Sequence, residues 1–114
     1  MPSISRAISI KQPFVELILQ GKKKFEYRTI STKIRERVYL YASLKERPEK
    51  ILWRQVEKNP GSLPVGMIVG SVEIADCIPN KKEGFAYKLR NPKRLSKPFK
   101  PKNQPSPVFW RPEF

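Results

Sequence analysis

The sequence predicts a small domain of the α+β class. Its 114 residues match the usual size of one domain, and we expect residues 1–114 to form a single unit. Hydrophobic residues make up 39% of the chain, a share typical of a globular protein. Segments with strand alternation are interspersed with two segments of helical spacing, and this mixture of periods indicates strands and helices in one layered fold.

The N-terminal part predicts a strand followed by a helix. Residues 7–10 form a short apolar stretch that favours a first strand. Pro13 suits the first position of a helix, because its missing N–H would have no partner there. The helix is expected to run to Gln20, and Gly21 then favours a left-handed end.

The stretch after this helix carries a lysine, a carboxylate and an arginine. Alternation along a strand over residues 24–29 puts Lys24, Glu26 and Arg28 on one face. Lys23 would then lie on the opposite face. For Lys23 to share a site with the other two charges, it must lie in the turn before the strand, and this is what we expect.

Three further strands and a second helix are expected downstream. Residues 37–43 show the clearest alternation, residues 67–78 are the longest apolar run and indicate a central strand, and residues 85–90 alternate again. Residues 47–58 predict a helix opened by Pro48. Its apolar face is expected to contain Ile51, Leu52 and Val56.

The C-terminal residues 91–114 hold six of the twelve prolines and six further lysines or arginines. Proline cannot donate to a strand ladder, so a regular interior strand is not expected there. The apolar side chains of Val108, Phe109 and Trp110 need burial, which predicts an ordered basic wrap with a short final strand at 108–111. The alternative is a flexible basic tail.

Charge and composition narrow the function. A net charge of +14 favours a polyanionic partner such as nucleic acid, although a basic surface can also serve solubility. The chain has one cysteine, Cys77, and no histidine, which excludes zinc fingers and histidine-based catalysis and predicts neither metal nor cofactor. Apolar runs are too short to span a membrane, and no signal-peptide pattern is present, so we expect a cytoplasmic protein. The sequence leaves the oligomeric state open, with a monomer as the default.

A family resemblance sharpens this picture. Gly21, Lys23, Glu26 and Arg28 give Gly-x-Lys-x-x-Glu-x-Arg, which resembles the signature of the ASCH domain. Similar matches occur from Ser9 to Gly21 and in later strands, so the resemblance covers nearly the whole chain. It implies a PUA-like small β-barrel of five or six mostly antiparallel strands, with two or three helices packed outside, and an association with RNA.

The resemblance also implies a cleft lined by the motif. Arginine offers a planar fork to phosphate, lysine a point charge, and tyrosine a face for stacking bases. The candidate nucleic-acid-binding residues are Lys22, Lys23, Lys24, Glu26, Arg28, Tyr41, Ser43 and Arg94. The alternative is an ion-pair network on an exposed strand, which would contribute under about 1 kcal/mol to stability.

Three functions stay open at this stage. The first is binding of RNA or a nucleotide in the motif cleft. The second is a hydrolase, since some members of the family resembled deacylate acetylated cytidine and others are reported to cleave RNA; Lys23 and Glu26 would then be catalytic. Glu26 stands where those deacylases have a threonine, so their mechanism does not transfer directly. The third is a protein-interaction module in a transcription or RNA-processing assembly.

Overall fold

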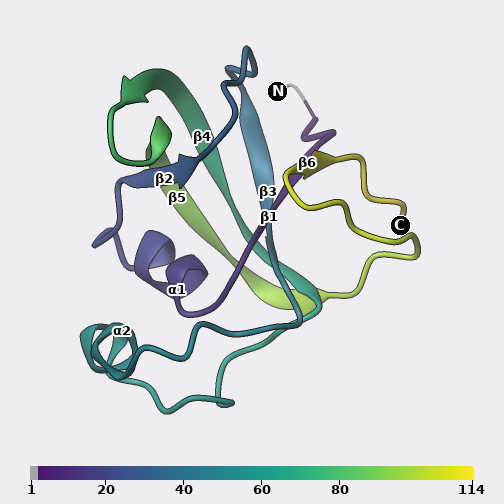
Figure 1. Cartoon of the computed structure of the whole chain (residues 1–114). Helices are drawn as coiled ribbons and strands as arrows, with labels where there is room; N and C mark the ends of the chain where they lie inside the picture. The colour runs from purple at the N-terminus through teal and green to yellow at the C-terminus, as the bar shows by residue number, and fades with distance from the viewer. Residues whose placement is uncertain (1–2) are drawn as a thin grey trace.

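The computed structural model describes residues 3–114 and confirms the α+β class (Figure 1). Two short helices are present, α1 (Phe14–Leu19) and α2 (Lys50–Val56). The strands are β1 (Ala7–Ile10), β2 (Phe25–Arg28), β3 (Arg37–Ala42), β4 (Met67–Asn80), β5 (Gly84–Phe99) and β6 (Phe109–Trp110). Neither helix within 3–114 has the length and hydrophobicity needed to span a bilayer.

All six strands belong to one mixed sheet with the order β2-β5-β4-β3-β1-β6. Among residues 3–114 only β1 and β3 pair in parallel, so the expected mostly antiparallel arrangement is confirmed. The long strands β4 and β5 curve strongly (Figure 1). No pairing joins β2 to β6 among residues 3–114, so the sheet is open and the predicted barrel closure is not confirmed.

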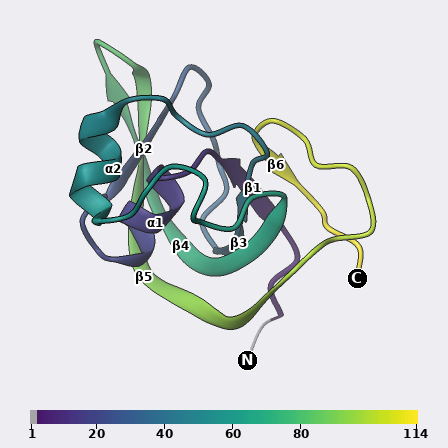
Figure 2. The ribbon, with the colours of Figure 1, turned by 90° about the horizontal axis from the view of Figure 1, so that it is seen from below.

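The core lies between this sheet and α1. Apolar side chains of β1, β3 and β4 meet Val15 and Ile18 of α1, and Tyr87 of β5 is fully buried beside them. Next to α1 lies α2 (Figure 2), held by a smaller cluster of Leu17, Trp53 and Val56. The helices therefore form a layer on one side of the sheet.

Two glycines occupy positions that a larger residue would not fit without strain. Gly21 has a φ of +77°, and the amides of Lys22 and Lys23 both donate to the backbone oxygen of Leu17. This left-handed turn with its two hydrogen bonds ends α1. Lys23 consequently lies in the loop before β2, as expected. Gly70 allows close approach of β5, because a Cβ there would lie 2.5 Å from the backbone oxygen of Lys93.

The prediction for α2 needs correction. The helix begins at Lys50 and not at residue 47, since the amide of Arg47 donates to the backbone oxygen of Gln12 and Glu49 is extended. Ile51 was expected in the apolar face but is 63% exposed. Trp53 anchors the helix instead, and its indole donates to the backbone oxygen of Arg47.

The expected end of the strand at Arg90 is also wrong, because β5 continues to Phe99. Its pairing with β4 shifts register around Pro92 and again before Phe99, so neither Pro92 nor Pro98 occupies a register position. The other edge of β5 pairs with β2 only as far as Lys88. Beyond Lys88 this edge needs no N–H for a strand partner, so prolines are tolerated there. β6 lies within the stretch 108–111 where a final strand was expected.

Candidate functional site

Arg28, at the end of β2, connects three separate segments. Its guanidinium donates to the Glu26 carboxylate at 2.9 Å, to the backbone oxygen of Pro107 at 3.0 Å and to the backbone oxygen of Ser9 in β1. Its side chain is 18% exposed. Arg28 therefore ties β2 to β1 and to the segment before β6, on the side where the sheet is open.

Lys23 joins the same charge network from the loop. Its ammonium lies 3.5 Å from Glu26 Oε1, 4.7 Å from the ring centre of Phe14 and 5.2 Å from that of Tyr27. The Glu26 side chain is 8% exposed, so it is a buried carboxylate between two cations. The structure thus brings Lys23, Glu26 and Arg28 together, in a buried network and not in a solvated one.

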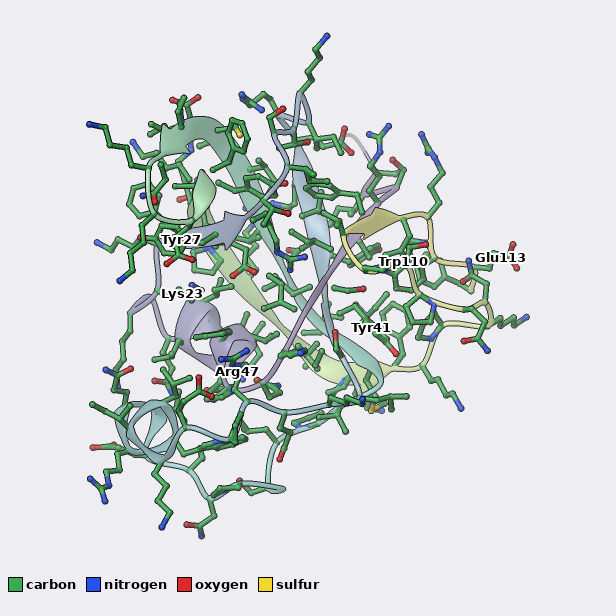
Figure 3. All side chains as sticks on the ribbon, viewed as in Figure 1. Lys23, Tyr27, Tyr41, Arg47, Trp110 and Glu113 are labelled. Carbon is green, nitrogen blue, oxygen red and sulfur yellow. The ribbon has the colours of Figure 1, made fainter. Side chains whose placement is uncertain are left out.

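A cleft of about 540 Å³ opens beside this network; we call it the motif cleft. Glu26 and Arg28 line it, together with Ser9 of β1 and the segment 105–107 before β6. Its aromatic lining consists of Phe14, Tyr27 and Tyr41. Figure 3 shows Tyr41 across from Lys23 and Tyr27, with Arg47 below them.

A second cleft of about 710 Å³ shares Phe14 and Tyr27 with the motif cleft; we call it the lysine cleft. Lys22, Lys23 and Lys24 line it, with Leu52 and Gln55 of α2 and apolar residues of α1 and β2. The Lys22 ammonium donates to the backbone oxygen of Gln55 at 2.6 Å. Lys23 lines this cleft and not the motif cleft, so the motif contributes to two neighbouring clefts.

Tyr41 and Ser43 both line the motif cleft from β3 and its end. The Tyr41 ring packs edge-on against Trp110, with centres 5.3 Å apart. Burial raises the pKa of the Tyr41 hydroxyl above its ordinary value of 10.0, so this group stays protonated at neutral pH. It is therefore available as a hydrogen-bond donor at the wall of the cleft.

Arg94 lies apart from this site. Both of its terminal nitrogens donate at 2.8 Å to the carboxylate of Glu16 in α1, which is 5% exposed. Burial would raise the pKa of Glu16, but hydrogen bonds from Arg94 and Gln20 outweigh it and hold this pKa below its ordinary 4.5. Arg94 therefore compensates a buried charge, and no local pattern in the sequence pairs it with Glu16, which is 78 residues away.

Three basic residues at the motif cleft were not singled out from the sequence. They are Lys11, Lys45 and Arg47. Lys11 and Lys45 are exposed and form no ion pair within 3–114, whereas Arg47 pairs with Glu49 and lies 5.8 Å from the Phe14 ring. They come from the loops after β1 and β3, which become neighbours only because those strands pair in parallel.

The ion pairs divide the cations by type. Of the nine arginines, seven pair with a carboxylate within the described chain: Arg6, Arg28, Arg35, Arg37, Arg47, Arg90 and Arg94. Of the fifteen lysines only Lys23 does so. The uncompensated charge of the described surface is therefore mostly carried by lysine, the more flexible and more strongly hydrated cation.

Comparisons with known proteins identify one matching family. Residues 8–100 match the family model described as the ASCH domain, which covers most of the chain. A search among curated proteins found no match.

In residues 3–114 no group of three or more acidic, cysteine or histidine side chains is placed to hold a metal ion.

Proposed function

This chain belongs to the ASCH domain family, and from that premise we propose that it binds RNA or a nucleotide in the motif cleft. The family is PUA-like and generally associated with RNA binding. The observation that supports the proposal most directly is the lining of the cleft. It combines aromatic faces with the unpaired lysines Lys11 and Lys45, a combination suited to a base and its phosphate.

Recognition is favoured over hydrolysis by the surroundings of Glu26. One carboxylate oxygen accepts from Arg28 and the other lies beside the Lys23 ammonium. A general base needs an oxygen that is free to contact the reacting proton, and both oxygens of Glu26 are already engaged by cations. In our proposal Glu26 instead positions Lys23 and Arg28, and it accepts at most a hydrogen bond from a bound base.

The PUA-like relationship also bears on the open side of the sheet. We propose that the fold is a barrel whose last seam, between the edge strands β2 and β6, is closed by a side chain and not by strand pairing. The contacts of Arg28 with Ser9 and Pro107 span this seam. The floor of the motif cleft would then be the seam itself. An RNA-binding role fits a cytoplasmic location.

The test is binding of a short labelled single-stranded RNA, followed by fluorescence anisotropy over a series of salt concentrations. The wild type should bind, and the logarithm of its affinity should fall linearly with the logarithm of salt concentration. A Lys11→Gln, Lys45→Gln double variant should bind more weakly. Its salt slope should be smaller by about 1.4, since each phosphate contact on a single strand contributes about 0.7.

The control carries the same charge change elsewhere. Lys81→Gln, Lys82→Gln alters two exposed lysines in the β4–β5 turn, outside the motif cleft. Equal losses in the two double variants would mean that binding is diffuse and that the motif cleft is not the site. Arg28 is left unchanged in this test because it holds the fold together. Product analysis on the same samples would detect hydrolysis and contradict a pure binding role.

A further inference from the structure

We infer that the bound nucleic acid is single-stranded and crosses a ridge formed by Phe14 and Tyr27, with one nucleotide in the motif cleft and the next in the lysine cleft. This inference rests on the proposed function and adds the path of the strand. It starts from the fact that Phe14 and Tyr27 line both clefts. The two clefts are therefore neighbours that share a wall.

The shared wall is suited to stacking. Tyr27 is 43% exposed even though it belongs to a strand, so its ring is available to a ligand. The Lys23 ammonium lies 4.7 Å from the centre of the Phe14 ring and 5.2 Å from that of the Tyr27 ring. It also pairs with Glu26, so the two rings and the carboxylate share one cation. The exposed part of such a ring can stack a base, which is how single strands are held without sequence readout.

Cations lie on both sides of the ridge. Lys11 and Lys45 flank the motif cleft, while Lys22 and Lys24 line the lysine cleft. All four are exposed and form no ion pair within the described residues. A ligand confined to the motif cleft would leave the second pair unused, whereas a strand crossing the ridge places phosphates near both pairs.

The shape of the site favours unpaired bases. Volumes of about 540 and 710 Å³ lie within the range of about 300–1,000 Å³ that is usual for clefts enclosing small molecules. Bases in a duplex are stacked and paired, so they cannot enter such hollows, while bases of a single strand can. The ligand class is therefore a single-stranded oligonucleotide of at least two nucleotides.

The experiment measures competition by uridine monophosphate and by uridine oligonucleotides of two, three and five residues against a labelled single-stranded RNA. We expect the affinity to rise about tenfold or more from one nucleotide to three, because a second base is stacked. Lys22→Gln, Lys24→Gln should weaken binding of the trinucleotide but not of the mononucleotide. Lys11→Gln, Lys45→Gln should weaken binding of both.

Two controls separate stacking from charge. Inorganic tripolyphosphate should compete poorly, because it has charge but no base. Tyr27→Leu keeps an apolar side chain at an exposed position but removes the ring, so it should abolish most of the gain with length. The inference is overturned if tripolyphosphate competes as well as the trinucleotide, if duplex RNA competes as well as a single strand, or if the Lys22, Lys24 variant behaves like Lys81→Gln, Lys82→Gln.

A different outcome would address the proposed function itself. If the wild type binds no uridine ligand and no labelled RNA even at low salt, the proposed function fails, and the strand path fails with it. If mononucleotide and trinucleotide bind with equal affinity, and only the motif-cleft variant is impaired, the proposed function stands and the strand path is wrong. The two failures are thus distinguishable in one data set.

Discussion

The guanidinium of Arg28 in β2 donates a hydrogen bond to the backbone oxygen of Ser9 in β1, although these two strands are not neighbours in the sheet. The same side chain holds Glu26 and the backbone oxygen of Pro107. Three acceptors from three segments therefore depend on one planar group. A lysine, with a single nitrogen, cannot reproduce this geometry.

Replacement of Arg28 should consequently act on stability. We expect Arg28→Lys to lower the free energy of unfolding by about 2 to 4 kcal/mol, because charge-assisted hydrogen bonds are lost and Glu26 stays buried. Urea unfolding measures the change. Arg54→Lys, on the exposed side of α2, is the matched control and should change stability by less than about 0.5 kcal/mol. Similar values for both variants would contradict a tie between the three segments.

Acid should destabilise the protein through Glu16. Its folded pKa lies below the ordinary 4.5, so its stabilising contribution is complete above that value and is lost as pH falls through the folded pKa. Glu16→Gln should lower stability at neutral pH and show a weaker acid dependence than the wild type. Urea midpoints measured from neutral pH to below 4.5 give both quantities. Glu83→Gln, in the exposed β4–β5 turn, should retain the wild-type pH profile.

Gly70 should not tolerate alanine. The added methyl group would lie 2.5 Å from the backbone oxygen of Lys93 and 2.7 Å from the Leu19 side chain, so β4, β5 or α1 must move. We expect a loss of about 1 to 3 kcal/mol, measured by thermal or urea unfolding. Gly61→Ala is the comparison, because Gly61 has a φ of +82° but open space, so only the backbone cost of about 1 kcal/mol applies. An equal or smaller loss at Gly70 would argue against this close approach.

The Tyr41 hydroxyl should ionise late. Burial raises its pKa above 10.0, so the difference between wild type and Tyr41→Phe in an ultraviolet absorbance titration should develop only above that pH. The Phe variant keeps the ring that packs on Trp110, and its fold should be unchanged. RNA binding by this variant should be weaker by a few fold if the hydroxyl donates to the ligand. A difference curve centred at or below 10.0 would show that the ring is not buried.

Local patterns in the sequence predicted most of the secondary structure. The positions of β1, β2 and β3 follow from alternation, and the left-handed Gly21 follows from glycine chemistry. The extension of β5 was not predictable in this way. Its irregular pairing with β4 and its partly free edge accommodate Pro92 and Pro98, and both are properties of the assembled sheet.

Of the candidate site, the sequence predicted the residues of the motif but not all of the other residues that line the motif cleft. Placing Lys23 in the loop followed from strand parity, and its contact with Glu26 agrees with that reasoning. Lys11 and Lys45 were missed, because the parallel pairing of β1 with β3 brings their loops together and no local pattern encodes it. Arg94 was misjudged for a similar reason, since its partner Glu16 is far away in the sequence.

The partly free edge of β5 has a consequence for solution behaviour. Beyond Lys88 no strand within 3–114 pairs with that edge, and an exposed strand edge can template pairing with a second chain. Two prolines, which lack an N–H, and the lysines Lys93 and Lys97 occupy this stretch. Prolines and lysines are the residues that natural sheets use against aggregation. The composition that obscures this strand in the sequence is thus also one that disfavours edge-to-edge pairing between chains.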